Sequence, residues 1–140
     1  MKLIRIVLLF GLAACAPEPT TPSDTSLAGT WRSGAHVLTL SNMRMVIVQE
    51  PKGIVSGEWF ARGDGGGGGC PAATPCDALG SLIGLHTVAQ VQIDLVGAGR
   101  FEGALVENDK LRGTFAVGES FDTITFVRNQ VVTFDERASR

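Results

Sequence analysis

The stretch Leu27-Ala28-Gly29-Thr30-Trp31 sets the pattern on which the fold of this chain depends. It places a glycine between two large apolar residues, two positions from each. Alternate residues of a β-strand lie on the same face, so in a strand Leu27, Gly29 and Trp31 would share one side of the sheet. A glycine inside a strand usually marks a tight bend or the close approach of another group. The stretch therefore predicts a curved strand with one apolar face.

The same arrangement recurs three times farther along the chain. A central glycine is flanked by large apolar residues in Val55-Ser56-Gly57-Glu58-Trp59, Phe101-Glu102-Gly103-Ala104-Leu105 and Leu111-Arg112-Gly113-Thr114-Phe115. The interior of a small β-barrel tapers, so large and small side chains must alternate there. We therefore interpret the repeat as the interior face of a barrel. Chance recurrence in a chain with 18 glycines is the alternative.

Turn residues divide the chain between Leu27 and Arg128 into eight expected strands. These are residues 27–33, 36–41, 43–49, 54–62, 89–95, 100–107, 110–117 and 121–128. Short turns between most neighbours imply antiparallel, up-and-down order. The predicted fold class is all-β, a single small antiparallel up-and-down barrel of about eight strands. The long connection from Gly63 to Leu85 is expected to hold at most one helical turn, after Asp77.

The beginning of the first expected strand resembles a known signature. Gly29-Thr30-Trp31 is similar to the G-x-W motif of the calycins, the barrel superfamily of lipocalins, fatty-acid-binding proteins and avidins. In that family the tryptophan closes one barrel end beneath a basic residue from the last strand, and Arg128 suits that role. The resemblance implies barrel closure by Gly29, Trp31 and Arg128. The polar contacts that avidins make to biotin have no match, so biotin binding is not expected.

Four side chains are candidates for contact with a ligand in such a barrel: Trp59, His36, Phe101 and Phe115. Residues Met45 to Val48 are apolar on both faces of their expected strand, which adds to the apolar surface. The glycines of the repeat leave two outcomes open. Either they provide space for a ligand, or side chains from the opposite wall fill that space and the barrel has no cavity.

The first fifteen residues have the order of an export signal. Lys2 and Arg5 precede an apolar run from Ile6 to Leu12, and small residues lead to Cys15. A transmembrane helix needs about 20 apolar residues, so this run is expected to serve export and removal, not permanent insertion.

The end of this leader, Leu12-Ala13-Ala14-Cys15, resembles the lipobox of bacterial lipoproteins at all four positions. The resemblance implies cleavage between Ala14 and Cys15 and a lipid anchor on Cys15. In lipoproteins of this kind, Ala16 after the cysteine usually means sorting to the outer membrane. A coincidental cysteine in an ordinary signal peptide is the alternative.

The amino-acid composition of residues 16–26 differs from that of the barrel region that follows. Residues 16–26 hold three prolines and no large apolar residue, which is typical of a semi-stiff linker. The expected organisation is therefore a lipoprotein signal peptide at 1–14, a lipidated cysteine with its linker at 15–26, a barrel domain at 27–135 and a tail at 136–140.

With Cys15 lipidated, Cys70 and Cys76 are the remaining cysteine pair. An exported chain enters an oxidising compartment, so we expect these two residues to form a disulfide. A metal site that combines both thiolates with His86 or Asp77 is the alternative, although the spacing is not that of zinc motifs.

Few residues could carry catalysis. His36 and His86 are the only candidates for a base at neutral pH, and no Gly-x-Ser-x-Gly motif or suggestive acidic pair occurs. We expect no enzyme, no catalytic residues, no metal and no cofactor. Without Lys2 and Arg5, 10 basic residues face 14 acidic ones, a net charge of −4 that argues against a nucleic-acid partner.

The leading functional hypothesis is a lipid-anchored lipoprotein of the bacterial envelope, with the barrel in the periplasm or at the cell surface. The barrel would act as a non-enzymatic binding module for a small apolar ligand or an envelope protein. The alternative is a purely structural or interaction barrel, or an inhibitor of secreted proteases. Small exported barrels that inhibit proteases begin with a similar Gly-x-Trp strand. They act through an N-terminal tail, but in this chain the corresponding residues, 16–26, are expected to form the linker to the membrane.

Overall fold

A computed structural model of the chain describes residues 25–65 and 69–129. Within them it contains eight strands and one short 3-10 helix, η1 (Pro51–Gly53). The strands are β1 (Gly29–Ser33), β2 (Leu40–Gln49), β3 (Ile54–Gly63), β4 (Cys76–His86), β5 (Val91–Leu95), β6 (Gly99–Glu107), β7 (Lys110–Val117) and β8 (Ser120–Arg128).

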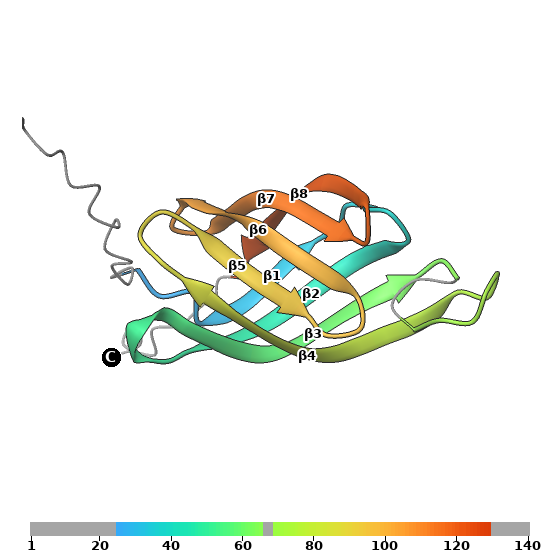
Figure 1. The fold of residues 1–140 in the computed structure, drawn as a ribbon, viewed down its shortest axis with the longest axis horizontal. Coiled ribbons are helices and arrows are strands. Elements are labelled where there is room, and N and C mark those ends of the chain that lie inside the picture. Colours follow the sequence, from blue (N-terminus) through green and yellow to red (C-terminus); the bar gives the residue numbers. More distant parts are fainter. Residues whose placement is uncertain (1–24, 66–68, 130–140) are drawn as a thin grey trace, which may run out of the picture.

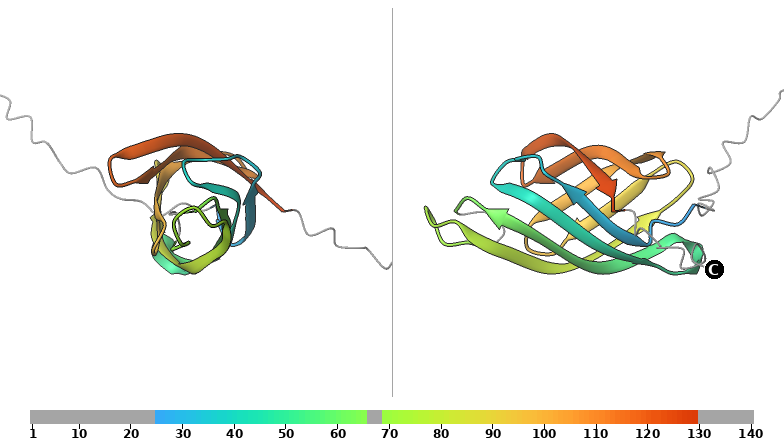
Figure 2. Two further views of the ribbon diagram at one scale, coloured as in Figure 1. Left: turned by 90° about the vertical axis from the view of Figure 1, so that its right-hand side faces the viewer. Right: turned by 180° about the vertical axis from the view of Figure 1, so that it is seen from behind.

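The strands form one closed barrel in sequence order (Figure 1). Each strand pairs antiparallel with the next, and β1 pairs with β8 through Trp31↔Arg128 and Arg32↔Val127. Figure 2 shows the ring of strands when the molecule is viewed from one end. The predicted all-β, eight-stranded, up-and-down barrel is therefore confirmed.

The barrel has two ends, which we name by their main features. At the tryptophan end, β1 starts at Gly29 and β8 finishes at Arg128, and η1 joins β2 to β3. At the disulfide end, β3 finishes at Gly63 and β4 starts at Cys76. Figure 1 shows that β3, β4 and their connection project beyond the neighbouring strands at this second end.

Three of the four repeated glycines, Gly57, Gly103 and Gly113, let neighbouring strands approach each other closely. A Cβ atom on Gly57 would overlap the carbonyl oxygen of Val46 on β2, and Gly57 has a φ of 151°, which L side chains rarely adopt. Gly103 and Gly113 face each other directly across β6 and β7, and a Cβ on either would overlap the backbone of the other strand. The glycines therefore provide sharp strand curvature, the use for which barrels select this residue.

The interior between these curved strands is filled with side chains. The largest of those that are less than 2% exposed include two tryptophans and three phenylalanines: Trp31, Trp59, Phe101, Phe115 and Phe126. Phe101 and Phe126 pack edge to face, with ring centroids 5.6 Å apart and planes at 84°. Close packing of this kind is typical of a barrel core.

The expected second strand, residues 36–41, is wrong. Residues 36–39 belong to a loop, with a single bridge between Val37 and Leu40 and a positive φ of 54° at Leu38, and residues 40 and 41 are the start of β2. Asn42, expected in a turn, instead lies inside β2 with a φ of 49°. Asparagine tolerates this conformation, so it makes a bulge in a continuous strand and does not end one.

The expected long loop from Gly63 to Leu85 is also wrong over its second half. Residues Cys76–His86 form β4, which pairs with β3 over ten positions, and no helical turn follows Asp77. Ala78, Gly80 and Gly84 occupy three inward positions of β4 and the buried Leu82 and His86 two others, whereas Leu79 and Ile83 point outward. Because large apolar residues lie on both faces and small residues lie inside, the strand lacks a clear alternation in the sequence. One false strand and one missed strand cancel, which leaves the count at eight.

Candidate functional site

Trp31 occupies the tryptophan end of the barrel. Its indole is fully buried, and its Nε1 donates a hydrogen bond of 2.8 Å to the carbonyl oxygen of Leu27. The Arg128 guanidinium lies 4.5 Å from the centre of the Trp31 ring, as the calycin resemblance implies. Arg128 also donates to the carbonyl oxygens of Ala28 and Ser26, at 3.1 and 2.6 Å. The first strand and the segment before it are thereby tied to the last strand.

His86 lies at the same end and is buried. Its side chain is 2% exposed, and its Nδ1 is 3.1 Å from Oε1 of Gln49, which also accepts a hydrogen bond from the amide of Leu27. Burial lowers the pKa of His86 from its usual value of 6.5, because the charged ring would lose its hydration. This histidine links β2 and β4 at the closed end of the barrel.

Three of the four candidate ligand contacts are core residues. Phe101 and Phe115 are fully buried, and Trp59 is 1% exposed. The Trp59 Nε1 donates a hydrogen bond of 3.1 Å to the Val96 carbonyl oxygen, in space that Gly80 leaves open because a Cβ there would overlap the indole. A ligand could reach these rings only by displacing their neighbours, so their role in binding stays a prediction.

His36, the fourth candidate, lies exposed at the disulfide end. Its Nε2 pairs with Oδ2 of Asp64, and the amide of Asp64 donates to the Thr39 carbonyl oxygen at 3.0 Å. The β1–β2 loop and the residues after β3 are thus held together on the surface.

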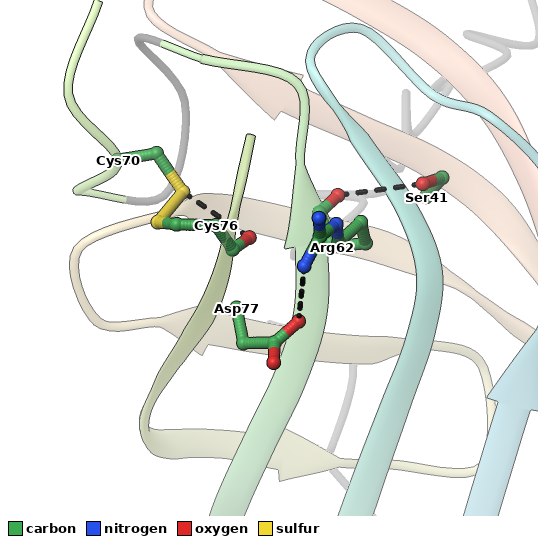
Figure 3. A network of polar contacts seen from close by, with 5 residues as sticks. All are labelled: Ser41, Arg62, Cys70, Cys76 and Asp77. Atoms are coloured by element: carbon green, nitrogen blue, oxygen red, sulfur yellow. Dashed lines mark hydrogen bonds and ion pairs between the residues drawn. A yellow bond between two sulfur atoms is a disulfide. The ribbon is translucent and has the colours of Figure 1, made fainter. Parts of the chain in front are cut away.

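The Cys70–Cys76 disulfide is confirmed (Figure 3). The two Cα atoms are 5.6 Å apart, and Cys70 packs into the core with 6% of its surface exposed. Because both sulfurs are bonded to each other, the alternative of a thiolate metal site is wrong. Within the described ranges, no three His, Cys, Asp or Glu residues are grouped so that they could hold a metal ion.

The most developed depression lies on β1 to β4 towards the disulfide end. It has a volume of about 820 Å³, and its walls carry Arg32, Arg44 and Arg62 with Phe60 and Leu79. We call these five residues and the space between them the arginine groove. Three further lining residues are small and nearly buried: Ser33, Ala61 and Ala78.

Strand register brings the groove residues together. Arg32 is directly opposite Arg44, Arg44 is opposite Phe60, and Phe60 is opposite Leu79. The Arg44 guanidinium lies 4.3 Å from the centre of the Phe60 ring. Arg62 forms a 3.0 Å ion pair with Asp77, shown in Figure 3, which also shows Ser41 Oγ donating to the carbonyl oxygen of Arg62.

The β-bulge in β2 decides that Arg44 points into this row. Ser41 pairs with Arg62 and Arg44 with Phe60, so two residues of β2, Asn42 and Met43, oppose one residue of β3. Without the extra residue, Arg44 would lie opposite Trp59 and share its inward face. The bulge was not expected from the sequence, because the expected strands 36–41 and 43–49 are divided at Asn42, where the bulge lies.

A second, smaller depression of about 300 Å³ lies at the tryptophan end. It is lined by the β4–β5 turn and the end of β6, and His86 and Glu107 border it. It contains no charged cluster comparable to the three arginines.

The predicted lipidation and cleavage residues, Cys15 and Ala14, lie outside the described residues, as do most of the linker and the tail at 136–140. In the part of the chain that the structure describes, no helix is long and apolar enough to cross a membrane.

No protein family, curated protein or solved structure that we compared with the chain matches it. The function is therefore inferred from the residues of this chain alone.

Proposed function

We propose that this protein is a lipid-anchored lipoprotein of the bacterial envelope whose barrel is a non-enzymatic binding module, and that the barrel binds through its outer surface. The proposed localisation at the membrane rests on Leu12-Ala13-Ala14-Cys15, which resembles a lipobox, and on the Pro-rich residues 16–26 that follow. Lipid chains on Cys15, at about 0.8 kcal/mol per buried CH₂, would hold the barrel at the outer membrane.

The observation that carries the binding mode is the packed interior. The inward-facing aromatic residues are buried against each other, so the interior offers little room for a ligand. The outer surface instead carries a groove with three arginines next to exposed apolar side chains, of which Leu79 is 69% exposed. Concave surfaces of several hundred Å³ with a few convergent polar groups are typical of ligand sites.

The membrane address is tested by expressing the full chain and its Cys15→Ser variant in a Gram-negative bacterium. We expect the unchanged chain in the outer-membrane fraction with acyl mass on Cys15, and the variant released from that fraction. The double variant Cys70→Ala/Cys76→Ala is the matched control, because it loses two cysteines but keeps the expected anchor. An unchanged chain without acyl mass would contradict the address.

The binding mode is tested by native mass spectrometry of the Cys15→Ser chain, purified without detergent. We expect the mass of the protein alone and no change in tryptophan fluorescence when neutral apolar ligands are added. A neutral molecule that co-purifies and leaves only on unfolding would instead place binding in the interior.

A further inference from the structure

The arginine groove combines positive charge with apolar surface in a chain that is acidic as a whole. Among its lining residues are three arginines and one aspartate, Asp77, an excess of two positive charges, whereas the entire chain has a net charge of −2. Asp77 is already paired with Arg62. Within residues 25–65 and 69–129, neither Arg32 nor Arg44 lies within ion-pair distance of a carboxylate.

The position of these two arginines is unfavourable for the barrel alone. Arg32 and Arg44 are direct partners in the β1–β2 register, and like charges directly opposite on one face of a sheet repel each other. An anion between them would remove that repulsion. Guanidinium groups suit this role because their planar N–H groups match the oxygens of a carboxylate or phosphate in a bidentate manner.

Apolar surface continues from the arginines along the same cross-strand row. The Arg44 guanidinium lies over the Phe60 ring, 4.3 Å from its centre, and Leu79 follows on β4 and is largely exposed. The row therefore places an apolar platform next to an anion-binding pair.

We propose that the arginine groove binds an organic anion, with a carboxylate or phosphate ester between Arg32 and Arg44 and an aromatic or aliphatic body on Phe60 and Leu79. This proposal deepens the proposed binding role but does not depend on the membrane address. Arg62, held by Asp77, sets the edge of the site at the disulfide end.

The test uses the full chain with Cys15→Ser, titrated with 1-naphthyl phosphate and 1-naphthoate while ¹H–¹⁵N spectra are recorded. We expect saturable shifts centred on residues 30–34, 42–44, 60–62 and 77–79, and affinity that falls as salt is added. The two anions distinguish a phosphate from a carboxylate head. Shifts centred instead on the depression beside His86 would overturn the proposal.

Two further ligands separate charge from apolar contact. Neutral 1-naphthol has the same ring system without the charge, and inorganic phosphate has the charge without the ring. We expect both to bind at least tenfold more weakly than 1-naphthyl phosphate. Equal binding of 1-naphthol would remove the role of the arginines, and equal binding of inorganic phosphate would remove the role of the apolar row.

Variants locate the contacts. Arg32→Gln and Arg44→Gln are each expected to weaken binding of 1-naphthyl phosphate about tenfold or more, and Leu79→Ser to weaken it severalfold. Arg112→Gln is the matched control, because Arg112 is an exposed arginine on β7, outside the groove. Near-ultraviolet circular dichroism checks that each variant is folded. Unchanged affinity in Arg32→Gln and Arg44→Gln, or an equal loss in Arg112→Gln, would overturn the proposal whatever the membrane fractionation shows.

Discussion

The two ends of the barrel are held together by different interactions. At the tryptophan end, Trp31 and His86 are buried; His86 joins β4 to β2 through Gln49, and Arg128 of β8 donates hydrogen bonds to the segment before β1. At the disulfide end, the loops are joined by the exposed His36–Asp64 pair and by a disulfide that closes a short ring. Buried contacts contribute far more to stability than exposed ion pairs. We infer that one end maintains the fold, whereas the other is free to carry a binding surface.

The largest expected effect is at the tryptophan end. Trp31→Ala should lower the free energy of unfolding by about 3–5 kcal/mol, because it removes a fully buried ring and leaves a cavity beneath Arg128. Phe121→Ala is the control at the disulfide end, where Phe121 is 73% exposed, and should change stability by less than about 0.5 kcal/mol. Urea unfolding followed by circular dichroism measures both. Similar losses in the two variants would remove the distinction between the ends.

Glycine substitutions should also destabilise the barrel unequally, with smaller losses of unfolding free energy than Trp31→Ala. Gly57→Ala should cost about 2–3 kcal/mol, because its Cβ would overlap the Val46 carbonyl oxygen in a backbone conformation unsuited to alanine. Gly34, in the β1–β2 loop, has no atom within 4 Å of an added Cβ, so Gly34→Ala is the matched control with almost no effect. The thermal unfolding midpoints of the two variants, compared with that of the unchanged protein, test this difference in stability. A tolerated Gly57→Ala would contradict the close strand approach.

Loss of the disulfide should have a moderate effect that is confined to its own end. The chain-entropy estimate for so short a ring is about 2 kcal/mol, so Cys70→Ala/Cys76→Ala should lower stability by that amount while the barrel stays folded. Amide hydrogen exchange should speed up mainly at the start of β4. Complete unfolding of the variant at room temperature would mean that the disulfide end also maintains the fold.

A smaller effect is expected from pH at the tryptophan end. Because burial lowers the pKa of His86 in the folded state, the unfolded chain binds its proton more readily. The contribution of neutral His86 is therefore fully present above pH 6.5 and is lost as the pH falls from 6.5 through the lower, folded-state pKa. Urea unfolding between pH 8 and pH 5 should show this decline, and His86→Gln should reduce the slope. An unchanged slope in the variant would assign the decline to other groups.

The smallest effect is expected from the exposed ion pair. A double-mutant cycle with His36→Ala and Asp64→Ala should give a coupling energy of at most about 1 kcal/mol, because both side chains are largely in water. A coupling of several kcal/mol would show that this pair, and not the disulfide, secures the loops.

Much of the barrel could be predicted from local pattern. Four copies of the glycine repeat identified interior positions, and strands such as β7 and β8 were expected within one residue of their bounds. The missed strand, β4, fails the pattern because three inward positions hold Ala78, Gly80 and Gly84, while Leu79 and Ile83 are large residues that point outward. Periodicity finds a strand only when its large residues face the core.

The candidate site was less accessible to sequence reasoning than the core. Arg32, Arg44 and Phe60 are far apart in the sequence, and nothing local indicates that they form one row. The signal that could have found them is Asn42, a residue that tolerates positive φ between two apolar runs and so permits a bulge. The predicted lipid anchor on Cys15 stays a prediction, since that residue is outside the described part of the chain.

The sequence by itself determined the all-β class and the glycine repeat, because each follows from residue type and spacing. It also predicted the Cys70–Cys76 disulfide, because the expected export signal and the lipidation of Cys15 leave these two cysteines as a pair in an oxidising compartment. Only the tertiary structure decided that the interior is filled, that β4 completes the ring, and that Arg44 points outward. Those properties depend on strand register. The bulge at Asn42 and Met43 shifts the register of β2 by one residue, so the side chains on its two sides alternate in opposite phase.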